Sequence, residues 1–309
     1  MTKLMPRMPS LTWILGAATI TAVCSGCAVR QTTVGKPAQT PVSLKTATKP
    51  DLVEQYNQLA NSVNSINASV TIQLTAGSSY SGVIEQYHEV SGFILAQKPS
   101  AIRVIGQVPI VGKNIFDMES DGKIFHIFVP SKNQFLEGPA DLERPSSKPI
   151  ENLRPQHLTD AIFWEPIRKE TPVLLEETTE PPSNFYVLTV VRIKRSNGAA
   201  SAGAGKPEDW EIARKIWFDR ANLNLVRIDA FEASGKPTAI VRYSNWDLFG
   251  DVHYPRQILL DRPQNDYQLH LTITKLTANE SIAPERFELL QPPGSDLARV
   301  GEGPEEQEP

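Results

Sequence analysis

The sequence predicts a mainly β protein of the α+β class, built on one large curved antiparallel sheet with a long N-terminal helix and short additional helices. Apolar and polar residues alternate in about ten short runs between residues 70 and 276. Turn sequences such as Asp121-Gly122 and Ser234-Gly235-Lys236-Pro237 separate several of these runs. Helical periodicity is confined to two segments, which excludes the alternating pattern of a parallel doubly wound sheet. A sheet of this size has to curl to bury one face.

Residues 1–26 have the order of an export signal. Lys3 and Arg7 precede an uncharged run, residues 11–23, that is too short to span a bilayer comfortably. Ser25-Gly26-Cys27 then resembles the lipobox of bacterial lipoproteins, although Cys24 stands where that motif usually has Leu. The resemblance implies cleavage between Gly26 and Cys27 and attachment of acyl chains, palmitate among them, to Cys27. An ordinary signal peptide and an uncleaved anchor are the alternatives.

The rest of the chain divides into a tether, one domain and a tail. Residues 27–50 are rich in Thr, Pro, Lys and Ala without apolar periodicity, which predicts a flexible tether. Residues 51–293 are expected to form a single domain, and the Gly- and Glu-rich residues 294–309 a disordered acidic tail. An Asp directly after Cys27 would resemble an inner-membrane retention signal, but this chain has Ala28 there. We therefore expect an outer-membrane anchor facing the periplasm.

Composition excludes several classes of function. The two cysteines, Cys24 and Cys27, both lie in the targeting segment, so the domain has no disulfide, no cysteine-ligated metal and no thiol nucleophile. The net charge of −4 and the absence of a basic block argue against nucleic-acid binding. No phosphate loop, dinucleotide fingerprint or nucleophile elbow occurs, so we expect no cofactor and no enzymatic activity.

The first predicted element is a helix of about four turns. Asp51 follows Pro50 as a candidate N-cap, and Glu54 lies at the spacing of a capping box. An apolar stripe then recurs every three or four residues: Leu52, Tyr56, Leu59, Val63 and Ile66. From Val70 to Leu74 the period changes to two, which predicts that the helix leads directly into a strand.

The remaining runs predict strands joined by hairpins. They are residues 83–97 (one strand, or two joined near Ser91-Gly92), 101–108, 114–119, 123–129, 185–193, 212–218, 223–231, 238–243, 256–260 and 267–276. A second helix is expected at 155–164, ended by Pro166. Residues 195–209 contain few large side chains and predict a mobile loop.

Two strands have faces that bear on function. In the run 267–276, Tyr267, Leu269, Leu271 and Ile273 are expected to share one face. In the run 123–129, both faces are apolar, so both are expected to be covered. Helices can cover one face, and the other can be a closed core or an apolar cavity in the curled sheet.

The order of elements resembles the lipoprotein-carrier family of LolA and LolB. The matching segments are Gly92-Phe93-Ile94-Leu95 with Lys98-Pro99, Asp121-Gly122 before Phe125, Trp217-Phe218-Asp219 before Leu225-Val226-Arg227, Tyr254-Pro255-Arg256, and Ile282-Ala283-Pro284 before Phe287. The resemblance covers residues 52–292 and implies an unclosed half-barrel with helices as a lid over its concave side. None of the family's transfer residues can be placed on numbered positions of this chain.

The candidate sites are few. The five histidines lack the spacing of a helical zinc site, and His126 and His270 are expected to be half-buried or surface strand residues. Val108, Pro109, Ile110 and Val111 form an apolar segment beside a predicted turn. If exposed, this segment can contact a membrane or guide an acyl chain; otherwise it plugs one end of the sheet.

Together these features favour a membrane-anchored envelope lipoprotein that binds a lipid or lipoprotein acyl chain in an apolar concave cavity. The alternative is a structural or assembly lipoprotein that holds an envelope protein partner.

Overall fold

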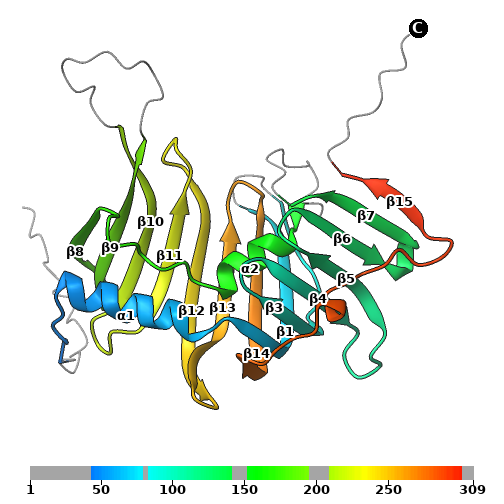
Figure 1. Ribbon diagram of the computed structural model, residues 1–309, viewed down its shortest axis with the longest axis horizontal. Coiled ribbons are helices and arrows are strands. Elements are labelled where there is room, and N and C mark those ends of the chain that lie inside the picture. Colours follow the sequence, from blue (N-terminus) through cyan, green and yellow to red (C-terminus); the bar gives the residue numbers. More distant parts are fainter. Residues whose placement is uncertain (1–42, 79–82, 141–151, 195–208, 301–309) are drawn as a thin grey trace, which may run out of the picture. The chain divides into compact units, whose positions relative to one another are not determined.

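The computed structural model describes residues 43–78, 83–140, 152–194 and 209–300. One sheet contains all fifteen strands of these residues, in the order β15-β7-β6-β5-β4-β3-β1-β14-β13-β12-β11-β10-β9-β8, with β2 pairing beside β1 (Figure 1). All neighbouring pairs are antiparallel except β15 and β7. The two ends of this order, β15 and β8, do not pair with each other, so the sheet is unclosed. This agrees with the predicted fold class.

Strand β1 (Ser65–Ser78) joins two groups of strands. On one side of it lie β2 (Val83–Gln86), β3 (Val90–Gln97), β4 (Ala101–Gln107), β5 (Asn114–Ser120), β6 (Ile124–Val129) and β7 (Gln134–Pro139). On the other lie β14 (Tyr267–Ala278), β13 (Val252–Arg262), β12 (Pro237–Phe249), β11 (Leu225–Phe231), β10 (Asp209–Asp219), β9 (Ser183–Lys194) and β8 (Val173–Glu180). Because β1 pairs with both β3 and β14, the two groups form one sheet.

The helix α1 (Lys49–Ser62) begins three residues earlier than expected from Asp51 and ends earlier than Ile66. Its N-cap is Thr48, whose hydroxyl accepts a hydrogen bond from the Asp51 amide, while the Asp51 carboxylate accepts one from the Thr48 amide. The prediction of Asp51 as N-cap is therefore wrong: it is the third residue of the helix, the position whose side chain completes the capping box. Ile66 is buried on β1 because the strand starts at Ser65.

The turn residues predict the positions of the hairpins correctly, but the predicted ends of several strands are displaced. The Asp121-Gly122 and Gly235 turns lie where predicted, and Gly122 has a φ of +91° that favours glycine. The break in the run 83–97 falls after Gln86, not at Ser91-Gly92, which lies inside β3. Strands β7 and β8 were not predicted. The second helix, α2 (Pro155–Ile162), ends two residues before the expected Trp164.

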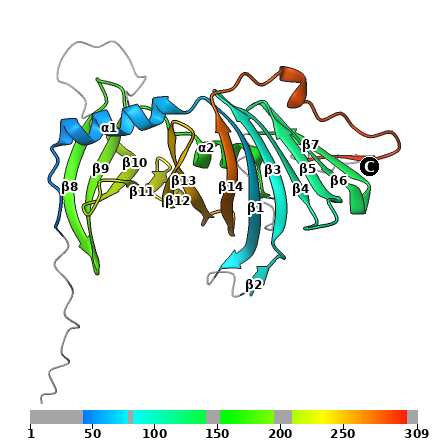
Figure 2. The same cartoon turned by 90° about the horizontal axis from the view of Figure 1, so that it is seen from below.

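Both helices pack on the same face of the sheet, which we call the inner face (Figure 2). Leu52, Tyr56 and Ala60 of α1 are buried there, and α2 buries Leu158 and Ile162. The opposing strand residues are apolar at every second position. They include Ile66, Val70, Ile72, Ile94, Ile102, Val104, Ile216, Ile258 and the predicted set Tyr267, Leu269, Leu271 and Ile273. All four members of that set are buried, which confirms their shared face.

The outer face of β4–β7 is partly covered by the C-terminal segment, residues 280–300. Arg103, which pairs with Asp117 at 2.8 Å, donates to the carbonyl oxygens of Arg286 and Glu288. The segment then forms β15 (Asp296–Arg299), so the expected disordered tail does not begin at residue 294. The cover is incomplete: Ile124 is 47% exposed, and the prediction that both faces of its strand are covered is wrong there.

The expected tether also reaches the sheet at its C-terminal end. The amide of Lys45 donates to the carbonyl of Arg220 at 2.7 Å, so this part of residues 27–50 lies against the turn after β10. Residues 1–42, 195–208 and 301–309 lie outside the described residues, and with them the expected signal peptide, most of the tether, the predicted loop and the end of the tail. Within the described ranges, no helix has the length and apolarity needed to cross a membrane.

Candidate functional site

An apolar cavity of about 280 Å³ lies on the inner face between α2 and the strands β1, β3, β5 and β14, and we call it the inner cavity. Its lining is contributed by several elements of the sheet and by the chain around α2. The residues are Ile72, Leu74, Tyr87, His88, Val90, Ile115, Phe116, Met118, Leu153, Leu158 and Leu269. No Asp, Glu, Lys or Arg is among them, so the cavity suits a hydrocarbon group rather than a charged one.

A pair of glycines forms the strand surface beside this cavity. Gly92 of β3 lies directly opposite Gly106 of β4. A Cβ atom on Gly106 would lie 2.3 Å from the ring of Phe116, and one on Gly92 would lie 3.0 Å from the Cδ1 atom of Ile72. Both neighbours line the cavity. Because these two positions lack side chains, the side chain of Phe116 can lie against the backbone of β4, and that of Ile72 against the backbone of β3.

Helix α2 closes the inner cavity with Leu158, which is 1% exposed, and is fixed at its first turn by a polar contact. The hydroxyl of Tyr267 lies 2.6 Å from Nδ1 of His157. Burial, together with the charges of Arg262 and Arg154, lowers the pKa of His157 to about 2. At neutral pH the imidazole is therefore uncharged and Nδ1 can accept the tyrosine proton.

The predicted apolar segment lies in the turn between β4 and β5, and we call residues 108–111 the tip. Val111 is 74% exposed and Ile110 is fully exposed, while Val108 is 37% exposed. The tip therefore does not plug the sheet. Ile110 has a φ of 71°, a backbone conformation that is strained for a β-branched residue. The tip leads into β5, whose Ile115 and Phe116 line the inner cavity.

The other predicted site residues have separate outcomes. Gly26 and Cys27 lie outside the described residues, so cleavage and lipid attachment stay predictions. His126 is partly buried on β6, where its two ring nitrogens contact the carboxylates of Glu119 and Glu137. No group of three or more metal-ligating side chains occurs in the described part of the chain.

The structure thus has an unclosed, mainly β sheet with an apolar cavity under a short helix. No protein-family model and no curated protein matches the sequence. Solved structures do match.

The matches include a LolA superfamily protein from Nitrosomonas europaea at 14% identity, covering 79% of this chain and 99% of that chain, with a TM-score of 0.45. A DUF1329 family protein from Desulfovibrio piger matches at 12% identity, 77% and 95% coverage and a TM-score of 0.47. A domain described as an outer membrane lipoprotein-sorting protein, from Vibrio parahaemolyticus, matches at 8% identity, 76% and 94% coverage and a TM-score of 0.45. These likenesses concern the fold alone.

Proposed function

We propose that this protein is a non-enzymatic envelope lipoprotein that binds an acyl chain of a lipid or lipoprotein in the inner cavity, and acts in lipoprotein sorting or lipid trafficking. The observation that carries the proposal is the cavity itself, whose lining has no charged side chain. Each methylene group that moves from water into such a site contributes about 0.8 kcal/mol. Affinity then comes from apolar area and cavity shape, without a polar motif in the sequence.

The size of the cavity limits what it can hold. Ligand pockets usually measure about 300–1,000 Å³, and the inner cavity, at about 280 Å³, lies at the lower end of that range. It therefore suits part of one acyl chain rather than a whole phospholipid. The remainder of the ligand would stay outside, at the membrane or on the lipoprotein that carries it.

The tip supports a role at a membrane surface. An exposed apolar segment that continues into a strand lining the cavity offers a path from a bilayer to the binding site. With Cys27 acylated, the protein would be held at the outer membrane facing the periplasm, because two or three acyl chains give stable anchoring. The tip would then contact a lipid surface repeatedly.

Native mass spectrometry tests the proposal. A protein that begins at Ser43 keeps the N-cap Thr48. It should be purified from a bacterial envelope, and its mass under native conditions compared with its denatured mass. A co-purifying species of lipid mass, or uptake of added phospholipid, is the expected result. A ligand-free mass together with no uptake would reject lipid binding.

A protein-binding role is the second candidate, and the free edge of β8 favours it. This strand ends the sheet, and Leu174 on it is 54% exposed. An exposed strand edge can pair with a strand of another chain. Recovery of one stoichiometric envelope partner by crosslinking, from protein that contains no lipid, would favour this role over the first.

A further inference from the structure

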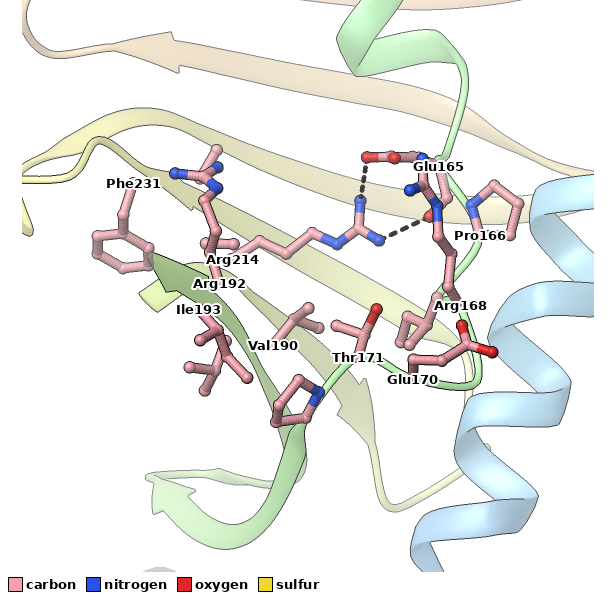
Figure 3. A pocket seen from close by; sticks show the side chains of 15 residues that line it. Glu165, Pro166, Arg168, Glu170, Thr171, Val190, Arg192, Ile193, Arg214 and Phe231 are labelled. Carbon is pink, nitrogen blue, oxygen red and sulfur yellow. Dashed lines mark hydrogen bonds and ion pairs between the residues drawn. The ribbon is translucent and has the colours of Figure 1, made fainter. Parts of the chain in front are cut away.

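A second cavity, of about 760 Å³, lies on the inner face at the other end of the sheet. Its walls are β9, β10 and β11 and the chain between α2 and β8, residues 163–172, which we call the strap (Figure 3). It shares no lining residue with the inner cavity. Its volume falls within the usual range of small-molecule sites, about 300–1,000 Å³. We call it the arginine cavity because three arginines line it.

The strap is held in place from α1. The side chain of Asn57 donates to the carbonyl of Ile167 at 2.9 Å and accepts from the amide of the same residue at 2.7 Å. Ile167 itself is 5% exposed. These paired hydrogen bonds fix the strap relative to α1, which itself packs on the inner face of the sheet. The arginine cavity is therefore largely formed before any ligand enters.

Arg214 of β10 is fixed inside this cavity. Its guanidinium lies 5.6 Å from the centre of the Tyr56 ring, and its Nη2 donates to the backbone carbonyl of Glu165 at 2.8 Å. Its Nη1 also lies 3.3 Å from the Glu165 carboxylate. The side chain of Arg214 is 17% exposed, whereas that of Glu165 is 70% exposed. The guanidinium therefore keeps its position without the carboxylate, and an exposed ion pair of this kind is weak.

Two further guanidinium groups line the same cavity. Arg192 of β9 is 55% exposed and lies 3.8 Å from the carboxylate of Glu211, a long contact. Arg168 lies on the strap, where its carbonyl accepts a hydrogen bond from the Thr171 amide at 3.1 Å. Its guanidinium has no ion pair or hydrogen bond with any of the described residues. The arginines come from three separate segments, and Figure 3 shows them around one opening. Glu165 and Glu170 are the acidic residues of the lining.

Apart from Thr171, the remainder of the lining is apolar. Val190, Ile193, Ala213, Ala230 and Phe231 come from the three strands, and Pro166 and Pro172 from the strap. Val190 is 4% exposed and belongs to the core. A ligand with its charge at the arginines would thus place its uncharged part against carbon atoms.

We propose that the arginine cavity binds an anionic amphiphile, meaning a carboxylate or phosphate group carried on a hydrocarbon body. The anion displaces the Glu165 carboxylate from Arg214 and is attracted by Arg168 and Arg192, and the hydrocarbon part lies on Val190 and Phe231. Guanidinium groups suit both anions because they present paired donors in a plane. This site is independent of acyl-chain binding in the inner cavity.

Fluorescence titration with cis-parinaric acid, a natural fluorescent fatty acid, tests the site, with its uncharged methyl ester as the matched probe. Two variants of the full chain change the charge around the cavity while Arg214 itself is kept. Glu165→Gln removes the competing carboxylate, and the double variant Arg168→Gln/Arg192→Gln removes two cations. We expect the acid to bind roughly five-fold tighter to the first and roughly five-fold weaker to the second, the effect of a partly exposed ion pair. The ester should bind all three proteins equally.

Equal affinities of the acid for the three proteins, or an ester that follows the acid, would overturn the proposal. Inorganic phosphate is the third probe: displacement of the acid by equimolar phosphate would mean that the site takes a free anion and not an amphiphile. If the protein binds no ester at all, acyl-chain binding in the inner cavity is refuted. The affinity of the acid for the three proteins still tests the anion site in the arginine cavity. Circular dichroism of each variant checks that the fold is retained.

Discussion

Replacing Gly106 by alanine is predicted to shrink the inner cavity. The new Cβ would lie 2.3, 2.5 and 2.8 Å from three atoms of the Phe116 ring, and ordinary contact begins at 3.4 Å. The ring therefore has to retreat by about 1.1 Å, the difference between 3.4 and 2.3 Å, away from β4. Because Phe116 lines the inner cavity, this movement takes room from a ligand.

Two quantities should change. Overpacking of this kind costs about 1–3 kcal/mol of unfolding free energy, measured by urea denaturation. If the displaced ring removes room for one methylene group, about 0.8 kcal/mol of binding is lost, roughly a four-fold weaker affinity for the uncharged ester probe. The double variant Gly106→Ala/Phe116→Leu, which removes the obstructing ring, should recover much of both losses.

The control is Ser91→Ala, on the neighbouring strand β3 but with an exposed side chain. It should change neither stability nor binding. If Gly106→Ala lowers stability as expected while ester affinity stays at the wild-type value, the ligand does not occupy the inner cavity. If stability also stays unchanged, the close packing of Phe116 on Gly106 is itself refuted.

Three further predictions concern the strap, the tip and α2. Asn57→Ala removes both hydrogen bonds to buried Ile167 and should lower the unfolding free energy by about 2–4 kcal/mol in urea denaturation; a loss below about 0.5 kcal/mol would show that the strap is held elsewhere. Ile110→Gly relieves a positive φ, so it should raise stability by about 1 kcal/mol yet weaken liposome binding, as should Ile110→Asp; liposome binding unchanged in both folded variants would exclude the tip as a membrane contact. The folded-state pKa of His157, about 2, lies below its unfolded value of 6.5. The stability that depends on uncharged His157 is therefore fully present above pH 6.5 and decreases as the pH falls below 6.5. Wild type should lose about 1.4 kcal/mol per pH unit there relative to His157→Gln, and parallel pH profiles of the two proteins would contradict this.

The sequence predicts the fold well where side-chain alternation and turn residues agree. Tyr267, Leu269, Leu271 and Ile273 repeat with a period of two, and all four lie on the inner face. Prediction fails where tertiary contacts override local pattern. Ile66 continues the helical stripe of α1, but pairing of β1 with β3 and β14 draws it into a strand. Strand β15 has no apolar alternation of its own and depends on pairing with β7.

The candidate sites follow the same rule. The tip could be predicted because its apolar residues are consecutive in the sequence, although only the structure gives its exposure. The inner cavity could not be, because Leu74, Phe116, Leu158 and Leu269 come together from four separate elements. The arginine cavity was also missed: Arg168, Arg192 and Arg214 are isolated in the sequence and resemble solvent-exposed charges until the sheet places them around one opening.

The most direct test of acyl-chain binding is photocrosslinking with a phospholipid that carries a diazirine near the end of one acyl chain. Vesicles containing this lipid should be irradiated with the protein, and the modified peptides identified by mass spectrometry. Occupation of the inner cavity predicts labels on peptides that contain Phe116, Met118 or Leu158, and fewer labels when unmodified lipid competes. Labels confined to the tip, or absent from every cavity-lining peptide, would contradict the proposed function.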